Sequence, residues 1–116
     1  MSPLPRSQLL KGTTELLVLS VLEEEVLHGY EIAQRIRDAA AGLVLSEGAL
    51  YPSLHRLERR GALTATWGPG EAGPRRRYYR LSDDGRGLLA EARAEWARFV
   101  ADVGAVTQTR EEGIGG

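Results

Sequence analysis

Arginine is the residue type whose spacing in this sequence points to a binding chemistry. Residues 46–80 hold seven Arg against three Glu and carry a charge of +4, whereas residues 1–45 carry −2 and residues 81–116 carry −3. Three of the Arg are consecutive, Arg75, Arg76 and Arg77. Adjacent cations repel one another, and guanidinium groups bind phosphate strongly. A basic segment inside a chain of net charge −1 therefore favours a nucleic acid as partner.

The rarer residue types argue against several other chemistries. The sequence has no Cys, so it offers no disulfide, thiol nucleophile or thiolate metal site. Its two His, His28 and His55, are too few for a metal cluster, and no Ser-His-Asp arrangement accompanies them. We expect a protein without enzymatic activity, metal or cofactor. We interpret His28 as a turn residue, and His55 as a phosphate contact, a base-edge contact or a solvent-exposed side chain.

Gly68, Gly70 and Gly73 spell G-x-G-x-x-G, which is formally a dinucleotide-binding fingerprint. That fingerprint requires a helix directly after the glycines, within a βαβ unit. Here two prolines interrupt the segment and a strand pattern follows it. We therefore interpret the glycines as the tip of a hairpin and discard a nucleotide-binding enzyme.

The segment that would carry the binding chemistry is predicted as a helix within residues 46–61. Leu50, Leu54 and Leu57 fall at i, i+4 and i+7 and form one apolar stripe. Ser46 is the predicted N-cap, and Gly61 the predicted residue just past the helix end. The opposite face carries Gly48, Pro52, His55 and Arg59, flanked by Ala49, Tyr51 and Arg56. Such a face fits a nucleic-acid groove, and the alternative interpretation is a solvated basic face.

Pro52 lies inside this predicted helix. A proline there removes a backbone hydrogen bond and typically costs about 3 kcal/mol. We therefore expect a helix that is irregular or begins tightly near Ser46, with Tyr51 and Ser53 turned towards the groove.

A β-hairpin is predicted directly after this helix. Residues 63–67 alternate between apolar and polar, residues 68–74 read as a loop, and residues 75–81 return as a basic strand. The alternation places Arg77, Tyr79 and Leu81 on one face and Arg76, Tyr78 and Arg80 on the other. The alternative is a plain solvated hairpin.

Two further helices are predicted upstream. Residues 8–24 are apolar on more than one side, with Gly12 inside the helix, so a second face remains for a partner chain. His28-Gly29 is predicted as a turn, and residues 30–41 as a helix with Tyr30, Ile32, Ala33 and Ile36 facing inward. Three helices followed by a hairpin make a winged helix-turn-helix.

A last helix is predicted from Ser82 to Thr107. Its apolar residues are spaced by 3, 4, 3, 4 and 3, which is a heptad seam: Leu89, Ala92, Trp96, Phe99, Val103 and Val106. We predict that a second copy of the chain covers this seam, and the alternative is packing on its own domain. Trp96 and Phe99 either fill the seam or form the aromatic wall of a pocket between subunits.

The predicted fold class is mainly α with a small β-hairpin: a winged helix-turn-helix domain plus a C-terminal dimerisation helix. We expect the DNA-binding domain at residues 1–81, with a loose arm at 1–6, the dimerisation helix at 82–107, and a disordered tail at 108–116. No long uncharged apolar run is present, so neither a membrane span nor a signal peptide is expected. The absence of Cys adds to the expectation of a cytoplasmic protein.

The sequence resembles the PadR family of bacterial winged-helix transcriptional regulators in four segments. These are LLKGTTELLVLSVL at 9–22, HGYEI at 28–32, GALYPSLHRLERRG at 48–61 and RRRYYRLSDDGRGLL at 75–89. The resemblance, to the branch with a single C-terminal helix, implies a homodimer held by the C-terminal and first helices. It also implies binding to pseudo-palindromic operator DNA, usually repression, and often relief by a small molecule.

From the residues and this resemblance we expect a sequence-specific DNA-binding transcriptional regulator, a homodimeric repressor relieved by a small hydrophobic or aromatic effector. The predicted contacts to double-stranded DNA are Ser46, Ala49, Tyr51, Ser53, His55, Arg56, Arg75, Arg76 and Arg77. The predicted dimer interface and effector pocket comprise Leu89, Ala92, Trp96, Phe99 and Val103. The alternative is a winged-helix protein-interaction module without sequence-specific DNA binding, which would dock through its last helix.

Overall fold

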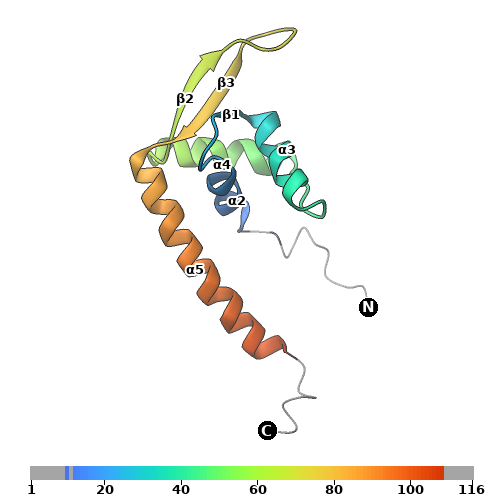
Figure 1. Ribbon diagram of the computed structural model, residues 1–116, viewed down its shortest axis with the longest axis vertical. Coiled ribbons are helices and arrows are strands. Elements are labelled where there is room, and N and C mark those ends of the chain that lie inside the picture. Colours follow the sequence, from blue (N-terminus) through green and yellow to red (C-terminus); the bar gives the residue numbers. More distant parts are fainter. Residues whose placement is uncertain (1–9, 11, 109–116) are drawn as a thin grey trace, which may run out of the picture.

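The computed structural model describes residues 10 and 12–108. Its labelled elements are α2 (Thr14–Val21), β1 (Leu27–His28), α3 (Gly29–Ala39), α4 (Glu47–Arg59), β2 (Leu63–Gly68), β3 (Arg76–Leu81) and α5 (Asp83–Thr107) (Figure 1). The predicted arm at 1–6 and residues 109–116 of the tail predicted at 108–116 lie outside the described residues. A mainly helical chain with one small antiparallel sheet confirms the predicted fold class.

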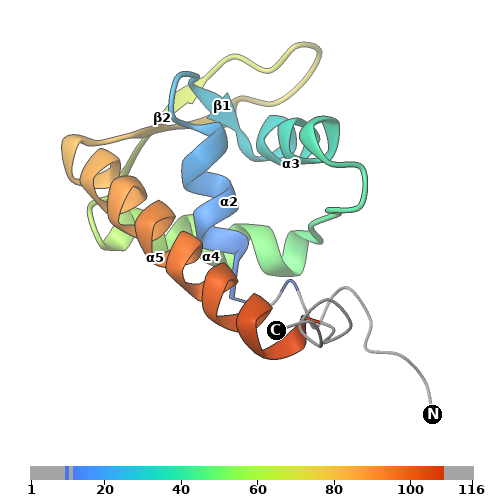
Figure 2. The same ribbon diagram turned by 60° about the horizontal axis from the view of Figure 1, so that its bottom comes forward.

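The core forms where α2 meets the other helices. Helix α2 packs against α3, α4 and α5, and it lies between them in Figure 2. The buried apolar side chains of α2, α3 and α4 are Val18, Leu19, Ile32, Ile36, Leu50, Leu54 and Leu57. Burying each such Leu or Ile contributes about 1.5–3 kcal/mol. The leucine stripe predicted for α4 thus faces the core, which leaves the opposite side of α4 outside.

Both ends of α4 are fixed by capping. The Ser46 hydroxyl oxygen accepts a hydrogen bond from the Ala49 N–H at 3.1 Å. At the other end the Ala62 N–H donates to the Leu57 carbonyl at 2.9 Å, and the Gly61 N–H donates to the Glu58 backbone carbonyl at 3.0 Å. This is a Schellman motif, and Gly61 supplies its left-handed residue with φ of +81°. The predicted N-cap and helix end are confirmed.

Pro52 does not interrupt α4, so the predicted irregularity is wrong. The hydrogen bond that Pro52 cannot make would reach Gly48, and both residues are exposed, so water can reach the unpaired carbonyl. The tight start is confirmed, because the Ala49 and Leu50 N–H groups both donate to the Ser46 carbonyl, at 3.1 and 2.9 Å.

The sheet has the strand order β1-β3-β2 and is antiparallel throughout. The β2–β3 hairpin, called the wing below, projects beyond the helices (Figure 1). Tyr79 and Leu81 are buried while Arg76 and Arg80 are exposed, which confirms the predicted alternation. The strand β1 was not predicted: two residues are too few to show a period, and pairing with β3 is a long-range contact.

Two predictions about the first helices are corrected. The helix predicted over 8–24 is too long, since α2 spans only Thr14–Val21 and Gly12 lies before it with φ of +91°. Residues 8, 9 and 11 of that prediction lie outside the described residues. Tyr30 does not face inward but is 60% exposed, because Ile32 and Ile36 occupy the inner face of α3.

Helix α5 begins with Ser82 as its N-cap, as predicted, since the Ser82 Oγ accepts from the Gly85 N–H at 3.0 Å. Leu89 is buried against the core, and the helix then runs away from the rest of the domain (Figure 1). None of the described helices is long and apolar enough to cross a membrane.

Candidate nucleic-acid interface

The outer face of α4 is open to solvent along its length. Five of its exposed residues are Gly48, Tyr51, Pro52, His55 and Arg59. The residues at the start of this face include the small Gly48, and the later part of the face carries an imidazole and a guanidinium. A helix with this profile can approach a groove closely at its start and hold phosphates further along.

Ser53 is not part of this face, and its predicted groove contact is wrong. The residue is 0% exposed, because it lies beside the leucine stripe rather than opposite to it. Its hydroxyl donates to the Ala49 carbonyl at 3.0 Å and accepts from Arg56 at 3.1 Å. Ser53 therefore satisfies its polar group inside the helix and orients a neighbouring guanidinium.

Arg56 bridges α4 and α2. Its Nε donates to the Glu15 carboxylate at 2.9 Å, and its side chain is still about half exposed, at 51%. The Arg56 guanidinium is thus held beside Ser53 in the second half of α4, with donors left for a further acceptor.

Tyr51 lies between the exposed face and the start of α3. A Cβ placed on Gly29 would come within 2.8 Å of the Tyr51 ring and of its hydroxyl, so only glycine leaves room for this ring. Tyr51 is 38% exposed, and it is therefore neither a core residue nor a fully free side chain.

The three consecutive arginines of the wing have different surroundings. Arg75 and Arg76 are exposed. Arg77 instead lies against Glu58 of α4, with the Nη2–Oε2 distance at 2.5 Å, and its guanidinium is 5.6 Å from the centre of the Trp67 ring. The hydrogen bond that Arg77 donates to the Glu58 carboxylate raises the pKa of Arg77. Arg77 thus joins the wing to α4, and its cation already has a partner.

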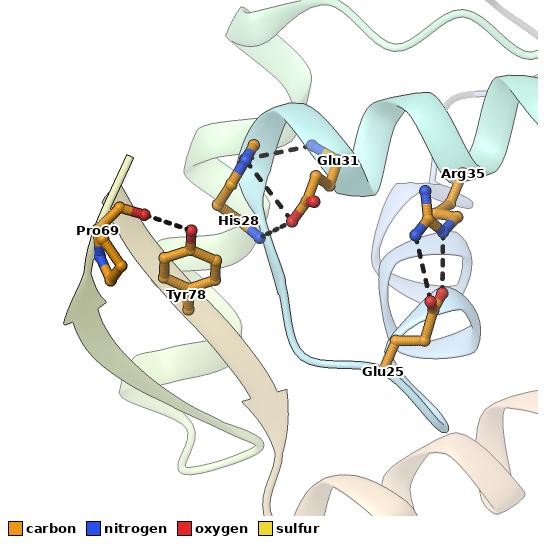
Figure 3. A network of polar contacts seen from close by, with 6 residues as sticks. All are labelled: Glu25, His28, Glu31, Arg35, Pro69 and Tyr78. Atoms are coloured by element: carbon orange, nitrogen blue, oxygen red, sulfur yellow. Dashed lines mark hydrogen bonds and ion pairs between the residues drawn. The ribbon is translucent and has the colours of Figure 1, made fainter. Parts of the chain in front are cut away.

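A second set of contacts fixes the wing from the side of α3 (Figure 3). The Tyr78 hydroxyl donates to the Pro69 carbonyl at 2.7 Å, and its ring meets the edge of His28 at 5.4 Å. The Tyr78 ring also fills the space beside Gly68, where a Cβ would lie 2.8 Å away. The tip of the wing is thereby tied back to the sheet.

His28 takes part in this set while it caps α3. Its Nδ1 accepts from the Glu31 N–H at 3.4 Å, and the Glu31 carboxylate accepts from the His28 N–H at 3.2 Å (Figure 3). This reciprocal pair is a capping box, with His in the place of Ser or Thr. The spacing of His28 and Glu31 is the signal from which the cap could have been predicted, whereas the sequence analysis assigned only a turn.

The cations that remain free gather on α4 and the wing. Among the described residues, Arg59, Arg60, Arg75 and Arg76 make no ion pair, and His55 is exposed beside them on α4. Elsewhere in the described chain, Arg35, Arg93 and Arg98 each have a carboxylate partner. Arg37 of α3, which bonds the Gln34 amide, and Arg86 of α5, which bonds the Glu23 carbonyl, also make no ion pair within that part of the chain. Unpaired arginines are therefore most numerous on α4 and the wing but are not confined to them.

The seam of α5 is covered by its own domain only at its start. Leu89 is buried and Ala92 is half-buried, whereas Trp96 is 42% exposed, Phe99 53% and Val106 85%. The Trp96 and Phe99 rings lie 6.0 Å apart. They line one side of a groove of 430 Å³, whose other side includes Leu16 and Leu19 of α2. Packing on its own domain therefore accounts for the first part of the seam alone.

Comparison with known proteins places this arrangement in one family. The family model "Transcriptional regulator PadR-like family" matches residues 18–91. Transcriptional regulator Rv3488 of Mycobacterium tuberculosis is 31% identical over 93 residues, which cover 80% of this chain and 84% of that protein.

Solved structures agree with this assignment. A PadR family transcriptional regulator from Eggerthella lenta is similar with a TM-score of 0.77 at 35% identity, covering 90% of this chain and 89% of that one. A transcriptional regulator from Clostridium thermocellum is similar with a TM-score of 0.78 at 29% identity, covering 87% and 99%. The chain therefore belongs to the PadR-like family of transcriptional regulators.

Proposed function

We propose that this chain is a homodimeric repressor that binds a pseudo-palindromic DNA operator in a sequence-specific manner and is released by a small hydrophobic or aromatic effector. PadR-family regulators are non-enzymatic DNA-binding proteins. The observation that carries the proposal is the open outer face of α4 beside a basic wing, the two being joined by the Arg77–Glu58 pair.

The helix α4 supplies the contacts that read sequence. In this proposal Ala49, Tyr51 and His55 face base edges, since an imidazole both donates and accepts hydrogen bonds. Ser46 still has a hydroxyl proton to donate while its oxygen caps the helix, and in this proposal it contacts a phosphate at the start of α4, while Arg56 contacts a phosphate further along the helix.

The wing supplies contacts that do not read sequence. Arg75 and Arg76 are exposed and unpaired among the described residues, so they are available to phosphates or to a minor groove. Arg77, which the sequence analysis also assigned to DNA, acts in this proposal through the position of the wing, because Glu58 already holds its guanidinium.

A second copy of the chain covers the exposed seam. In this proposal residues up to 81 form the DNA-binding unit and residues 82–107 the dimerisation helix. The seam continues as Trp96, Phe99, Val103 and Val106, all exposed in the single chain. A two-fold axis at this seam would present two α4 helices about 34 Å apart, one turn of DNA, as a palindromic site requires.

The groove beside Trp96 and Phe99 is the proposed effector site. Two aromatic rings on one wall and leucines on the other favour a flat, apolar ligand. Because the groove lies between α2 and the dimerisation helix, a ligand there would alter the angle between the two DNA-binding units.

In vitro selection from a random duplex library tests the proposal. We expect an inverted repeat to be enriched by the wild type. His55→Ala should relax the preference at one base position of each half-site, and the control Arg98→Ala, on α5, should not change the motif. If the intact dimer enriches no sequence, sequence-specific binding is wrong and the protein-interaction module becomes the better account.

A further inference from the structure

Helix α5 is attached to the winged-helix domain at its first turn. The Ser82 N–H donates to the Ala62 carbonyl at 3.0 Å, and the Ser82 hydroxyl donates to the Gly61 carbonyl at 2.5 Å. Gly85 lies so close that a Cβ there would be 2.0 Å from the Ala62 oxygen. This attachment fixes where α5 begins, but one fixed point does not determine the direction of a rod.

A second attachment involves Glu23, which follows α2. Two nitrogens of Arg93 donate to the two carboxylate oxygens of Glu23, at 3.0 and 2.8 Å. Arg86 donates to the Glu23 carbonyl at 2.9 Å, so Glu23 binds two residues of α5 that are about two helical turns apart. The hydrogen bond from Arg93 lowers the pKa of Glu23, which is therefore ionised at neutral pH.

The same segment is also tied to α3. Glu25 accepts two hydrogen bonds from Arg35, at 2.9 and 3.2 Å (Figure 3). Glu24, between them, is exposed and makes no ion pair among the described residues. Residues 23–25 thus connect the helix-turn-helix directly to the side of α5 that carries Arg86 and Arg93.

We propose that Glu23, together with Arg86 and Arg93, sets the angle of α5 against the winged helix and thereby the distance between half-sites that the dimer accepts. This inference rests on the proposed DNA-binding dimer. Glu23 is a positioning residue in it, since it touches neither DNA nor the seam.

A small change in the angle of α5 produces a large displacement of the seam, because the seam lies far from the first turn of the helix. From Gly85 to Phe99 the helix rises about 21 Å, at about 1.5 Å per residue. A swing of about 10° about the first turn would move the seam, and the dimer axis with it, by about 4 Å. The rise of one base pair is about 3.4 Å. Loosening the contacts of Glu23 with Arg86 and Arg93, called the clamp below, should therefore let the dimer also accept spacings that differ by one or two base pairs.

The test uses duplexes with identical half-sites whose separation changes in single base-pair steps. The wild type should prefer one separation. Glu23→Gln should reduce that preference by about fivefold, the effect of one well-formed ion pair, while affinity for a single half-site and the dimer mass stay unchanged. Glu24→Gln removes the same charge from the same segment and should behave as wild type. If affinity depends on half-site separation in Glu23→Gln as it does in the wild type, or if Glu24→Gln changes that dependence equally, the proposed clamp is wrong.

A distance measurement separates this inference from the proposed function. The chain has no Cys, so spin labels can be placed through Thr66→Cys on the wing and Ala101→Cys on α5, in dimers diluted with unlabelled chain. Glu23→Gln should broaden the distance distribution and Glu24→Gln should not. If Glu23→Gln and the wild type give equal distance distributions, the proposed clamp is wrong, even if the protein binds DNA. Broadening without any DNA binding by the wild type would refute the proposed function and the spacing role, and leave Glu23 as a structural tie only.

Discussion

Arg77 of the wing and Glu58 of α4 form an ion pair at 2.5 Å, with the Arg77 guanidinium above the Trp67 ring. The pair joins the two elements proposed to bind DNA, one from the helix-turn-helix and one from the sheet. It also divides the arginine triplet, because Arg77 has a partner in the domain while Arg75 and Arg76 are exposed. Arg76 and Arg77, consecutive in β3, thus have different surroundings.

The first prediction follows from this division. Arg76→Ala should weaken binding to all duplexes alike and reduce the salt slope by about 1, as the loss of one phosphate contact does. Glu58→Gln should release Arg77, raise affinity for unrelated DNA with a steeper salt slope, and reduce discrimination between operator and unrelated DNA. Salt slopes equal to wild type in both variants would show that the wing does not contact DNA.

The second prediction concerns the tip of the wing. Tyr78→Phe removes only the hydroxyl that donates to the Pro69 carbonyl, a bond worth about 0.5–1.5 kcal/mol. Amide hydrogen exchange over residues 70–75 should accelerate by up to about tenfold. Tyr30→Phe is the control, since Tyr30 is exposed and its hydroxyl makes no hydrogen bond within the described residues. Equal exchange in both variants would mean that Tyr78 does not hold the tip.

The third prediction concerns the seam. Truncation of a buried Phe to Ala typically costs about 3–5 kcal/mol, so Phe99→Ala should shift the protein towards monomer. Operator binding should be lost as well, although Phe99 makes no contact with DNA in this proposal. Arg98→Ala, which removes only a surface pair with Glu95, should leave the mass by light scattering at the dimer value. A wild type that is monomeric at micromolar concentration would contradict the proposed dimer.

The fourth prediction separates the two interpretations of Trp96. In a Trp67→Phe background Trp96 is the only tryptophan and reports directly on the groove. A flat aromatic compound should quench its fluorescence and weaken operator binding, and Trp96→Ala should remain dimeric with a weaker effector response. If Trp96→Ala instead dissociates the dimer as Phe99→Ala does, the side chain packs the seam and the pocket is wrong.

The fifth prediction concerns acid. Hydrogen bonds from Arg93 and Arg35 lower the pKa values of Glu23 and Glu25 below the ordinary 4.5. The folded state therefore holds fewer protons, so the stability from these pairs is complete above pH 4.5 and is lost as the pH falls through the lowered pKa values. Glu23→Gln with Glu25→Gln should flatten the decline in unfolding free energy below pH 4.5, measured with denaturant, whereas Glu24→Gln should retain it. A double variant as acid-sensitive as wild type would contradict this cause.

Local signals predicted most of the fold. Leu50, Leu54 and Leu57 occur with helical period, and Ser46 and Gly61 act through neighbouring backbone, so the limits and orientation of α4 could be inferred from the sequence. The wing followed from alternation and its glycine-rich loop. Long-range contacts could not be inferred in this way. In the fold, this is why β1 was missed and why Tyr30 was wrongly expected to face inward.

The candidate site was predicted less completely for the same reason. Its residues were chosen by charge and face, yet the burial of Ser53 depends on how α4 packs, and the partner of Arg77 depends on how the wing meets α4. Glu58 and Glu23 carry no signal in sequence beyond their charge. Their roles come from arginines 19 and 70 residues away, which only the fold brings into contact.

A ratio of affinities measures whether this dimer distinguishes one DNA sequence from others. Fluorescence anisotropy at a fixed salt concentration of about 150 mM would compare the selected inverted repeat with a scrambled duplex of equal length and composition. We expect the inverted repeat to bind at least about 1,000-fold more tightly, with one dimer per duplex. Equal affinities for the two duplexes, with equal salt slopes, would show that the dimer does not read sequence.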